Sequence, residues 1–237
     1  MNGRAPDLGV AVVTGAGSGI GREIALALAR RGHRLALVGR RRAPLERTLA
    51  EAGGEGLILP ADVRDVSALA DVARSALALG PPEVVVAAAG AAAVAPFLEA
   101  EAAEFERIVD VNLLGTARLL RGFLPAMVAR GRGAVVPILS VAARQAFPGW
   151  SAYAASKWGL LGLVETLRIE LAGSGVRIIA MTPGATDSPL WNDLPGSWDR
   201  QRMIPAAEVA NALLWALDAG DAVAIEEIRM RPPGGDL

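Results

Sequence analysis

The chain has 237 residues, a hydrophobic fraction of 52% and a formal net charge of −1 at pH 7. This length suits a large buried core, and the near-neutral charge gives no reason to expect nucleic acid as a partner. Since there is no cysteine and only one histidine, the composition excludes disulfides, thiolate nucleophiles and Cys-ligated metals, and we expect no metal site.

Short apolar runs alternate with helical patterns along almost the whole chain. Most runs are apolar at consecutive positions, as strands buried on both faces of a sheet are. This alternation predicts an α/β fold, a Rossmann-type doubly wound parallel sheet with helices on both faces, as one domain over residues 1–237. The predicted strands are Val10–Thr14, Leu35–Gly39, Gly56–Pro60, Val84–Ala88, Ala134–Leu139, Arg177–Thr182 and Val223–Met230. The predicted helices are Ile20–Arg31, Pro44–Ala52, Ser67–Leu79, Ala102–Arg130, Ser151–Ala172 and Pro205–Ala219.

A glycine-rich turn follows the first predicted strand and opens the first predicted helix. In open parallel sheets, ligands bind outside the carboxyl ends of the strands. Glycines let the backbone approach a pyrophosphate closely, and the free N–H groups at a helix start favour an anion. The turn therefore predicts a dinucleotide site, although a plain strand-to-helix turn can look similar. Its candidate residues are Gly15, Gly17, Ser18, Gly19, Ile20 and Gly21.

The end of the second predicted strand indicates which dinucleotide binds. Folds that bind NAD usually place an acidic residue here, whereas this chain has Gly39 followed by Arg40. A guanidinium group is well shaped to hold a 2′-phosphate, so Arg40 favours NADP (as NADPH) over NAD. The alternative interpretation is a solvated basic turn.

Tyr153 and Lys157 are the only tyrosine and the only lysine of the chain, and they lie four residues apart on a predicted helix. At this spacing they share one helix face. A phenol is a poor base at neutral pH unless a neighbouring cation stabilises the phenolate. Ser140, at the end of the fifth predicted strand, is placed to hold a carbonyl oxygen beside the tyrosine. This set predicts acid–base chemistry on a carbonyl or alcohol.

The motifs together resemble the short-chain dehydrogenase/reductase family, from about Val10 to Ser188. Those that carry the resemblance are the glycine turn, Asp62-Val63, Asn112 within Val111–Gly115, Ser140, Tyr153-Ala-Ala-Ser-Lys157 and Pro183-Gly184. The resemblance implies an NADP-dependent oxidoreductase that interconverts a carbonyl and an alcohol by hydride transfer. The alternative is a non-catalytic NAD(P)-binding regulatory or scaffolding protein of the same fold.

The resemblance also implies roles for matching residues. Tyr153 is the expected acid/base, and Ser140 holds the carbonyl. Lys157 binds the nicotinamide ribose and lowers the pKa of the tyrosine. Asn112 holds a water that relays protons, although an asparagine in a long helix also fits a simple kink. The expected cofactor contacts include Tyr153 and Lys157, the glycine turn, Arg40, Asp62, Val63, Gly90, Pro183, Gly184 and Thr186.

Three departures from the family pattern stand out. Ala87-Ala88-Ala89-Gly90 replaces the usual Asn-Asn-Ala-Gly, and Pro137 lies inside the fifth predicted strand, where a missing N–H is unfavourable. The threonine expected after Pro-Gly is either Thr186 or Ser188. Asp62 either accepts from the adenine amino group, as its counterpart does in the family, or is a loop carboxylate.

The substrate is a small carbonyl or alcohol compound that the sequence does not name. A lid over about residues 185–204 carries Leu190, Trp191, Leu194, Trp198 and Met203, which suggests a modest apolar pocket. Phe147 and Trp150 either add a wall to it or are ordinary packing. Arg144 either meets an anionic substrate or is a surface residue.

The sequence also gives expectations for the oligomeric state and the location of the protein. The resemblance implies a homodimer or homotetramer, with Trp158, Leu161 and Val164 apolar enough for its interface. No run reaches the ~18 uninterrupted apolar residues of a membrane span, and the N-terminus, with Arg4 and Asp7, lacks a signal-peptide pattern. We therefore expect a cytoplasmic protein without a membrane partner.

Overall fold

A six-stranded parallel sheet forms the centre of the protein in a computed structural model that describes residues 8–220 and 222–235. Arg4 and Asp7 lie outside the described residues. The strand order is β3-β2-β1-β4-β5-β6, so the order reverses between β1 and β4, and the doubly wound prediction is confirmed. The strands are β1 Val10–Thr14, β2 Arg34–Gly39, β3 Gly56–Pro60, β4 Pro82–Ala87, β5 Gly133–Pro137 and β6 Val176–Ile178.

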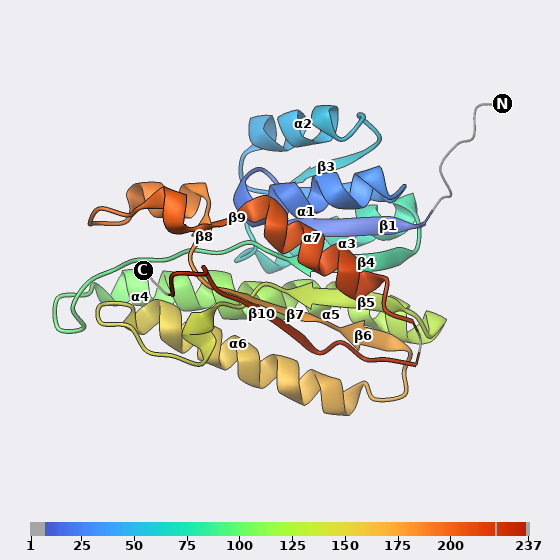
Figure 1. Ribbon diagram of the computed structural model, residues 1–237. Helices are drawn as coiled ribbons and strands as arrows, with labels where there is room; N and C mark the ends of the chain where they lie inside the picture. Colours follow the sequence, from blue (N-terminus) through green and yellow to red (C-terminus); the bar gives the residue numbers. More distant parts are fainter. Residues whose placement is uncertain (1–7, 221, 236–237) are drawn as a thin grey trace.

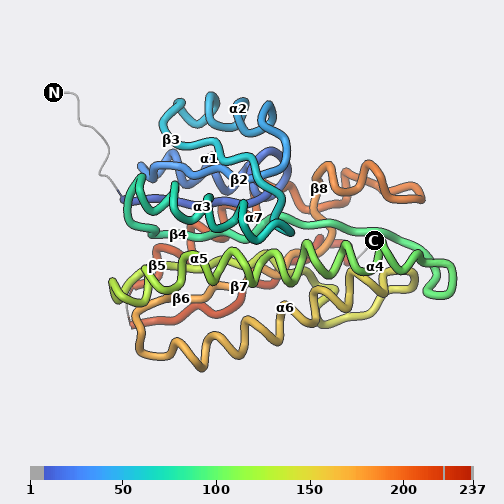
Figure 2. The backbone as a smooth tube through the Cα atoms, turned by 180° about the vertical axis from the view of Figure 1, so that it is seen from behind, coloured from blue at the N-terminus to red at the C-terminus, as the bar shows by residue number. Residues whose placement is uncertain are grey.

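Helices cover both faces of this sheet. Figure 1 looks onto the face covered by α1 and α7, and Figure 2 shows α3, α5 and α6 on the opposite face. The helices are α1 Gly19–Arg30, α2 Arg42–Glu51, α3 Val66–Leu79, α4 Ala102–Val109, α5 Gly115–Arg130, α6 Ser151–Glu170 and α7 Ala206–Leu217. Within the described ranges, no helix is both long and apolar enough to cross a membrane. The cytoplasmic location remains a prediction.

Successive side chains of β1 pack into two different hydrophobic cores, one on each face of the sheet. Val10 and Val12 pack towards α3, α5 and α6, whereas Ala11 and Val13 pack towards α1 and α7, and all four are fully buried. Alternate side chains of a strand point to opposite faces, so a strand covered on both faces must be apolar at every position. This explains the continuous apolar runs in the sequence.

The structure corrects two predicted elements. The predicted helix Ala102–Arg130 is interrupted by a π-helical turn, Asp110–Leu114, between α4 and α5. The predicted strand Arg177–Thr182 divides into β6 and β7, Ala180–Pro183, because β6 pairs with β5 whereas β7 pairs with β10, Glu227–Met230. The Pro137 problem is resolved by position, since Pro137 is the last residue of β5 and the next N–H, that of Ile138, donates to Ala87 O.

The expected interface residues on α6 separate into two groups. Leu161 and Val164 are buried in the core, so the prediction that they form a surface patch is wrong. Trp158 is 52% exposed on the outer side of the same helix.

The lid emerges beyond the carboxyl ends of the strands. Its base is a short parallel pair, β8 Thr186–Asp187 with β9 Ile204–Pro205. Between them lie two 3₁₀ turns, Pro189–Asp193 and Arg200–Arg202. In Figure 1 this orange segment projects from the sheet on the side where β1 meets α1. The lid therefore stands over the glycine turn.

Candidate active site

The glycine turn between β1 and α1 is shaped to admit a ligand against its backbone. Gly15 and Gly19 have φ values of +68° and +53°, the left-handed region that favours glycine. A Cβ on Gly17 would lie 2.8 Å from Pro44 Cβ, and one on Gly15 would lie 2.7 Å from Ala88 O. Ser18 begins α1 without a side-chain capping hydrogen bond. The first N–H groups of the helix are thus available to an anion.

Thr14 ties this turn to the segment that follows β4. Its Oγ1 accepts hydrogen bonds from the backbone N–H groups of Ala88 and Ala89, both at 3.1 Å. It also donates to Val86 O at 3.4 Å. The hydroxyl therefore braces the alanine segment that stands where the family has two asparagines.

A cavity of about 580 Å³ runs from the glycine turn to the lid. It brings together residues that are far apart in the sequence, and they come from the ends of β1, β2, β4 and β5, from α6 and from the lid. Of the predicted site residues, it is lined by Gly15, Ser18, Gly19, Ile20, Gly21, Arg40, Gly90, Ser140, Tyr153, Lys157, Pro183, Gly184 and Thr186.

A second cavity, of about 170 Å³, adjoins the glycine turn on the side of β2 and β3. The predicted residues that line it are Gly15, Gly17, Ser18, Arg40, Asp62, Val63 and Gly90. It is also lined by Arg41, Arg64 and Arg107, which sequence reasoning missed. The arginine run at residues 40–42 was a signal for Arg41, whereas only folding brings Arg64 and Arg107 to this place.

Asp62 is engaged by Arg64 within the same loop. The Arg64 guanidinium donates from Nε at 3.1 Å and from Nη2 at 2.7 Å, and the Arg64 backbone N–H donates at 3.0 Å. These hydrogen bonds hold the pKa of Asp62 below its usual value. Asp62 is thus a loop carboxylate that also faces the second cavity.

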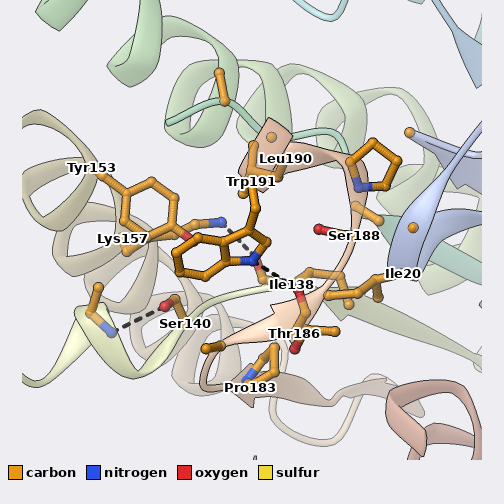
Figure 3. Close-up of a pocket in the computed structure, with 18 of the residues that line it drawn as sticks. Ile20, Ile138, Ser140, Tyr153, Lys157, Pro183, Thr186, Ser188, Leu190 and Trp191 are labelled. Atoms are coloured by element: carbon orange, nitrogen blue, oxygen red, sulfur yellow. Dashed lines mark hydrogen bonds between the residues drawn. The ribbon is translucent and has the colours of Figure 1, made fainter. Parts of the chain in front are cut away.

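Tyr153 and Lys157 lie on α6, where the helix passes the end of β5. The Lys157 Nζ lies 5.5 Å from the centre of the Tyr153 ring and donates to Ile138 O at 2.8 Å. Figure 3 shows both side chains and Ser140 at one end of the cavity. The predicted trio is therefore assembled in one place.

Ser140 begins a 3₁₀ turn, Val141–Ala143, directly after β5. Its Oγ accepts from the backbone N–H of Ala142 at 3.1 Å. That bond fixes the side chain and leaves its own O–H as a donor. A hydroxyl in this position is oriented rather than free to rotate.

Burial controls the proton affinities of the pair. It lowers the pKa of the Lys157 ammonium from 10.5 to about 8, because a charged group loses water. It raises the pKa of the Tyr153 phenol, and a hydrogen bond with Ser140 acts in the opposite direction. The expectation that Lys157 lowers the pKa of Tyr153 stays a prediction.

Asn112 lies in the π-helical turn and is 1% exposed. Its Oδ1 accepts from Ala91 N at 2.8 Å, and its Nδ2 donates to Ala91 O and to Ser156 Oγ, both at 2.9 Å. The side chain thus anchors the strand-end segment that contains Gly90, and it also belongs to a helix irregularity.

The lid separates into residues that line the cavity and residues that hold the lid together. Leu190, Trp191 and Trp198 line the cavity, as do Phe147 and Trp150 from the loop before α6. Leu194 and Met203 are 8% and 5% exposed and are absent from the cavity wall, so their predicted place in the pocket is wrong.

The structure settles one of two alternatives left by the sequence, that of Arg144, whereas Thr186 and Ser188 both remain candidates. Thr186 donates to Gly184 O at 3.0 Å and is 5% exposed, and both Thr186 and Ser188 line the cavity. Arg144 pairs with Glu227 at 2.8 Å and does not line the cavity. Arg144 is therefore a surface ion-pair residue.

Known proteins share this arrangement along most of the chain. A family model described as short chain dehydrogenase matches residues 9–197. A glycine betaine reductase of Emericella nidulans is 37% identical over 94% of this chain, which spans 18% of that longer protein. A 2-dehydro-3-deoxy-L-rhamnonate dehydrogenase (NAD(+)) of Sphingomonas sp. is 37% identical over 79% of this chain and 76% of its own. The X-ray structure of an alcohol dehydrogenase from Thermococcus sibiricus, complexed with 5-hydroxy-NADP, superimposes with a TM-score of 0.87 at 33% identity, covering 94% of this chain and 96% of its own.

Proposed function

The chain belongs to the short-chain dehydrogenase/reductase family and is an oxidoreductase acting on CH–OH and C=O groups, and from this premise we propose that Tyr153, Ser140 and Lys157 carry the reaction. The observation that carries the proposal is the meeting of the chain's only tyrosine and only lysine with Ser140 in one cavity. Random packing of a single tyrosine and a single lysine would rarely produce such a site.

The site fits a nicotinamide dinucleotide. The glycine turn leaves no room for a Cβ at Gly15 or Gly17, and the free start of α1 suits a pyrophosphate. Gly90 lines the path between the two cavities, and Val63 lines the smaller one. Lys157 would hold the nicotinamide ribose, and the segment Pro183–Thr186 the carboxamide. When bound, the reduced dinucleotide supplies a hydride to the carbonyl carbon.

Within this cofactor class we propose a preference for NADP over NAD. Arg40 and Arg41 line both cavities, next to Gly39 at the end of β2, where an NAD-binding fold would place a carboxylate. Guanidinium groups pair well with a 2′-phosphate. The Thermococcus enzyme was solved with an NADP derivative, whereas the Sphingomonas relative is named for NAD(+). Resemblance alone does not choose between them.

The protein's own part in the reaction is to hold the carbonyl and to move one proton. In reduction, the Tyr153 hydroxyl gives its proton to the carbonyl oxygen, and the Ser140 hydroxyl donates a hydrogen bond to the same oxygen. Ser140 Oγ accepts from the Ala142 N–H, which leaves the serine proton free to be donated to the carbonyl oxygen. In alcohol oxidation the tyrosine takes the proton back. Lys157 supplies positive charge beside the phenol.

The test is an assay of NADPH and NADH oxidation against a panel of aldehydes and ketones, with the wild type and Tyr153→Phe. Loss of general acid catalysis should lower kcat by about 10²–10⁴-fold, while the Kd of the cofactor, followed by tryptophan fluorescence, stays unchanged. Full activity in Tyr153→Phe would refute the assignment. Tight cofactor binding without turnover of any panel member by the wild type would favour the non-catalytic alternative.

We also propose that the enzyme is a homodimer or homotetramer that associates through α5 and α6. Trp158 on α6 is 52% exposed, and Ile169 on the same helix is 79% exposed. The two lie eleven positions apart, about three helical turns, so they share one face. Large apolar side chains gathered on an outer face indicate a protein contact.

A further inference from the structure

Three of the chain's five tryptophans gather at the lid end of the main cavity. The ring centres of Trp191 and Trp198 are 4.8 Å apart, and those of Trp150 and Trp191 are 5.8 Å apart. Trp150 also meets the Tyr153 ring at 5.4 Å. The other two tryptophans, Trp158 and Trp215, are exposed on helices. Figure 3 shows the Trp191 indole extending into the cavity beside Tyr153.

The hydrogen bonding of Trp191 shows which part of its ring is available. Its indole N–H donates to Thr186 O at 2.9 Å, which fixes the polar edge of the ring against the base of the lid. At Trp191 a ligand in the cavity therefore meets ring carbon and π surface, whereas the indole N–H of Trp198 is buried without a hydrogen-bond partner among the described residues. Indole is the side chain whose face attracts cations most strongly, and it also accommodates neutral apolar groups.

The charges around the cavity decide between these two kinds of ligand. Its charged lining residues are Arg40, Arg41, Lys157 and Asp193. Arg40 and Arg41 lie by the glycine turn, and Lys157 is bonded to Ile138 O. Among the described residues that line its lid end, Asp193 is therefore the one charged side chain, while Arg200 lies behind it, bonded to Asn192 at 3.1 Å and to Asp187.

Asp193 belongs to the same 3₁₀ turn as Trp191, Pro189–Asp193. Within the described part of the chain it forms no ion pair, whereas the nearby lid residue Arg200 is paired with Asp187 at 2.5 Å. Asp193 is exposed and lines the cavity at its lid end, and a carboxylate there attracts a cation and repels an anion. A plain hydrocarbon pocket would gain nothing from it.

We propose that the carbonyl substrate carries a quaternary or tertiary ammonium group, held by Trp150, Trp191, Trp198 and Asp193. This rests on the proposed function, because the carbonyl oxygen is placed at Tyr153 and Ser140. Trp150 lies 5.4 Å from Tyr153, centre to centre, and cation–π attraction acts within about 6 Å of a ring centre. An ammonium group on Trp150 therefore lies close to a carbonyl group held at Tyr153.

The first test measures binding without chemistry. Tetramethylammonium chloride is titrated into NADP⁺-saturated protein, with sodium chloride at equal ionic strength and tert-butyl alcohol, which cannot be oxidised by hydride transfer, as the uncharged comparison. Tetramethylammonium alone should give a saturable change in tryptophan fluorescence. Trp198→Leu and Asp193→Asn should each weaken it by about threefold or more. Trp215→Leu, which removes an exposed tryptophan of α7 outside the cavity, is the matched control and should leave it unchanged.

The second test compares two ketones of nearly the same shape, of which one carries a cationic nitrogen. Because this nitrogen also activates the carbonyl, the deciding quantity is the change of the kcat/KM ratio in Asp193→Asn. Trimethylammonioacetone and 4,4-dimethylpentan-2-one present the same carbonyl and nearly the same shape, with nitrogen in place of carbon. The wild type should favour the ammonium ketone by about tenfold or more in kcat/KM. Asp193→Asn should reduce this ratio by about threefold or more, whereas Trp215→Leu keeps it.

Each contrary result has a definite meaning. Equal use of both ketones, or no saturable effect of tetramethylammonium, overturns the ammonium proposal while the carbonyl reductase assignment stands. Failure of the wild type to reduce any carbonyl compound overturns the proposed function instead. The fluorescence titration then decides the cation site independently.

Discussion

The Lys157 ammonium donates its hydrogen bond to the Ile138 carbonyl oxygen at 2.8 Å, with its nitrogen 5.5 Å from the centre of the Tyr153 ring. The end of β5 therefore fixes the position of the cation, and the phenol is near it without being its bonded partner. Any effect of the charge on Tyr153 must therefore act through space. How strongly it acts depends on the fraction of Lys157 that is protonated.

We predict that Lys157 titrates near pH 8 in the protein without cofactor. Burial lowers its pKa from 10.5 to about 8, so the ammonium is charged at pH 7 and largely neutral at pH 9. Because the chain has one lysine, protein labelled with ¹³C at the lysine ε-carbon gives a single side-chain resonance whose shift follows this titration. A midpoint near 10.5 would show that the site is wetter than its burial indicates.

We predict that Arg40→Ala combined with Arg41→Ala weakens NADPH binding by about 10–100-fold and changes NADH binding little. Both side chains line the two cavities next to the end of β2, and only NADPH carries the phosphate they would pair with. Tryptophan-fluorescence titrations give both Kd values. Arg42→Ala is the matched control, since Arg42 faces Glu46 at 3.7 Å and lines neither cavity. An equal loss for both cofactors would contradict the phosphate role.

The elements of the sheet could be predicted from the sequence, because buried parallel strands are apolar at every position. The bounds of β1 and β3 match the prediction. A kink at Asn112 was one alternative left by the sequence, but the π-helical turn Asp110–Leu114 and its partners could not be predicted, since Asn112 reaches across to Ala91 and Ser156. Periodicity along one segment carries no information about such a partner.

The site shows the same division. Side chains with distinctive chemistry at the strand ends, such as Tyr153 and Ser140, could be predicted because topology alone brings strand ends together. The hydrogen bond from Lys157 to the Ile138 carbonyl oxygen could not be predicted, because every residue has a carbonyl group and the sequence does not show which one a side chain reaches. Arg64 was missed for another reason: its place beside Asp62 depends on loop geometry.

We predict that Ser140→Ala lowers kcat/KM by about 10²–10³-fold, the usual effect of removing one donor to a reacting oxygen. The Kd of the cofactor should stay within about twofold of the wild-type value, because Ser140 is assigned to the substrate oxygen. A lower kcat/KM with an unchanged cofactor Kd then locates the defect in the substrate step. Steady-state kinetics and fluorescence titration measure the two quantities. Ser140→Thr keeps a hydroxyl at the same backbone position and should retain more activity than the alanine variant. Equal loss in both would point to a packing defect.

We predict that Trp158→Glu lowers the oligomeric state. The side chain is 52% exposed on α6, and a buried carboxylate without a partner is strongly unfavourable at a protein interface. Light scattering coupled to size exclusion gives the mass of both proteins. Trp215→Glu, at an exposed site on α7, is the comparison. A wild type that is monomeric at micromolar concentration would remove the basis for the proposed association.

We predict that Asn112→Ala destabilises the protein by about 2–4 kcal/mol. The change would leave both the N–H and the carbonyl of Ala91 without their partner in a buried place, and each unpaired group costs about 1–3 kcal/mol. The loosened segment includes Gly90, which lines both cavities, so cofactor affinity should fall as well. Urea denaturation and fluorescence titration measure the two effects, and Asn211→Ala on the exposed side of α7 is the matched control. Unchanged stability and affinity with lost turnover would instead favour the proton-relay role that the family resemblance implies for Asn112.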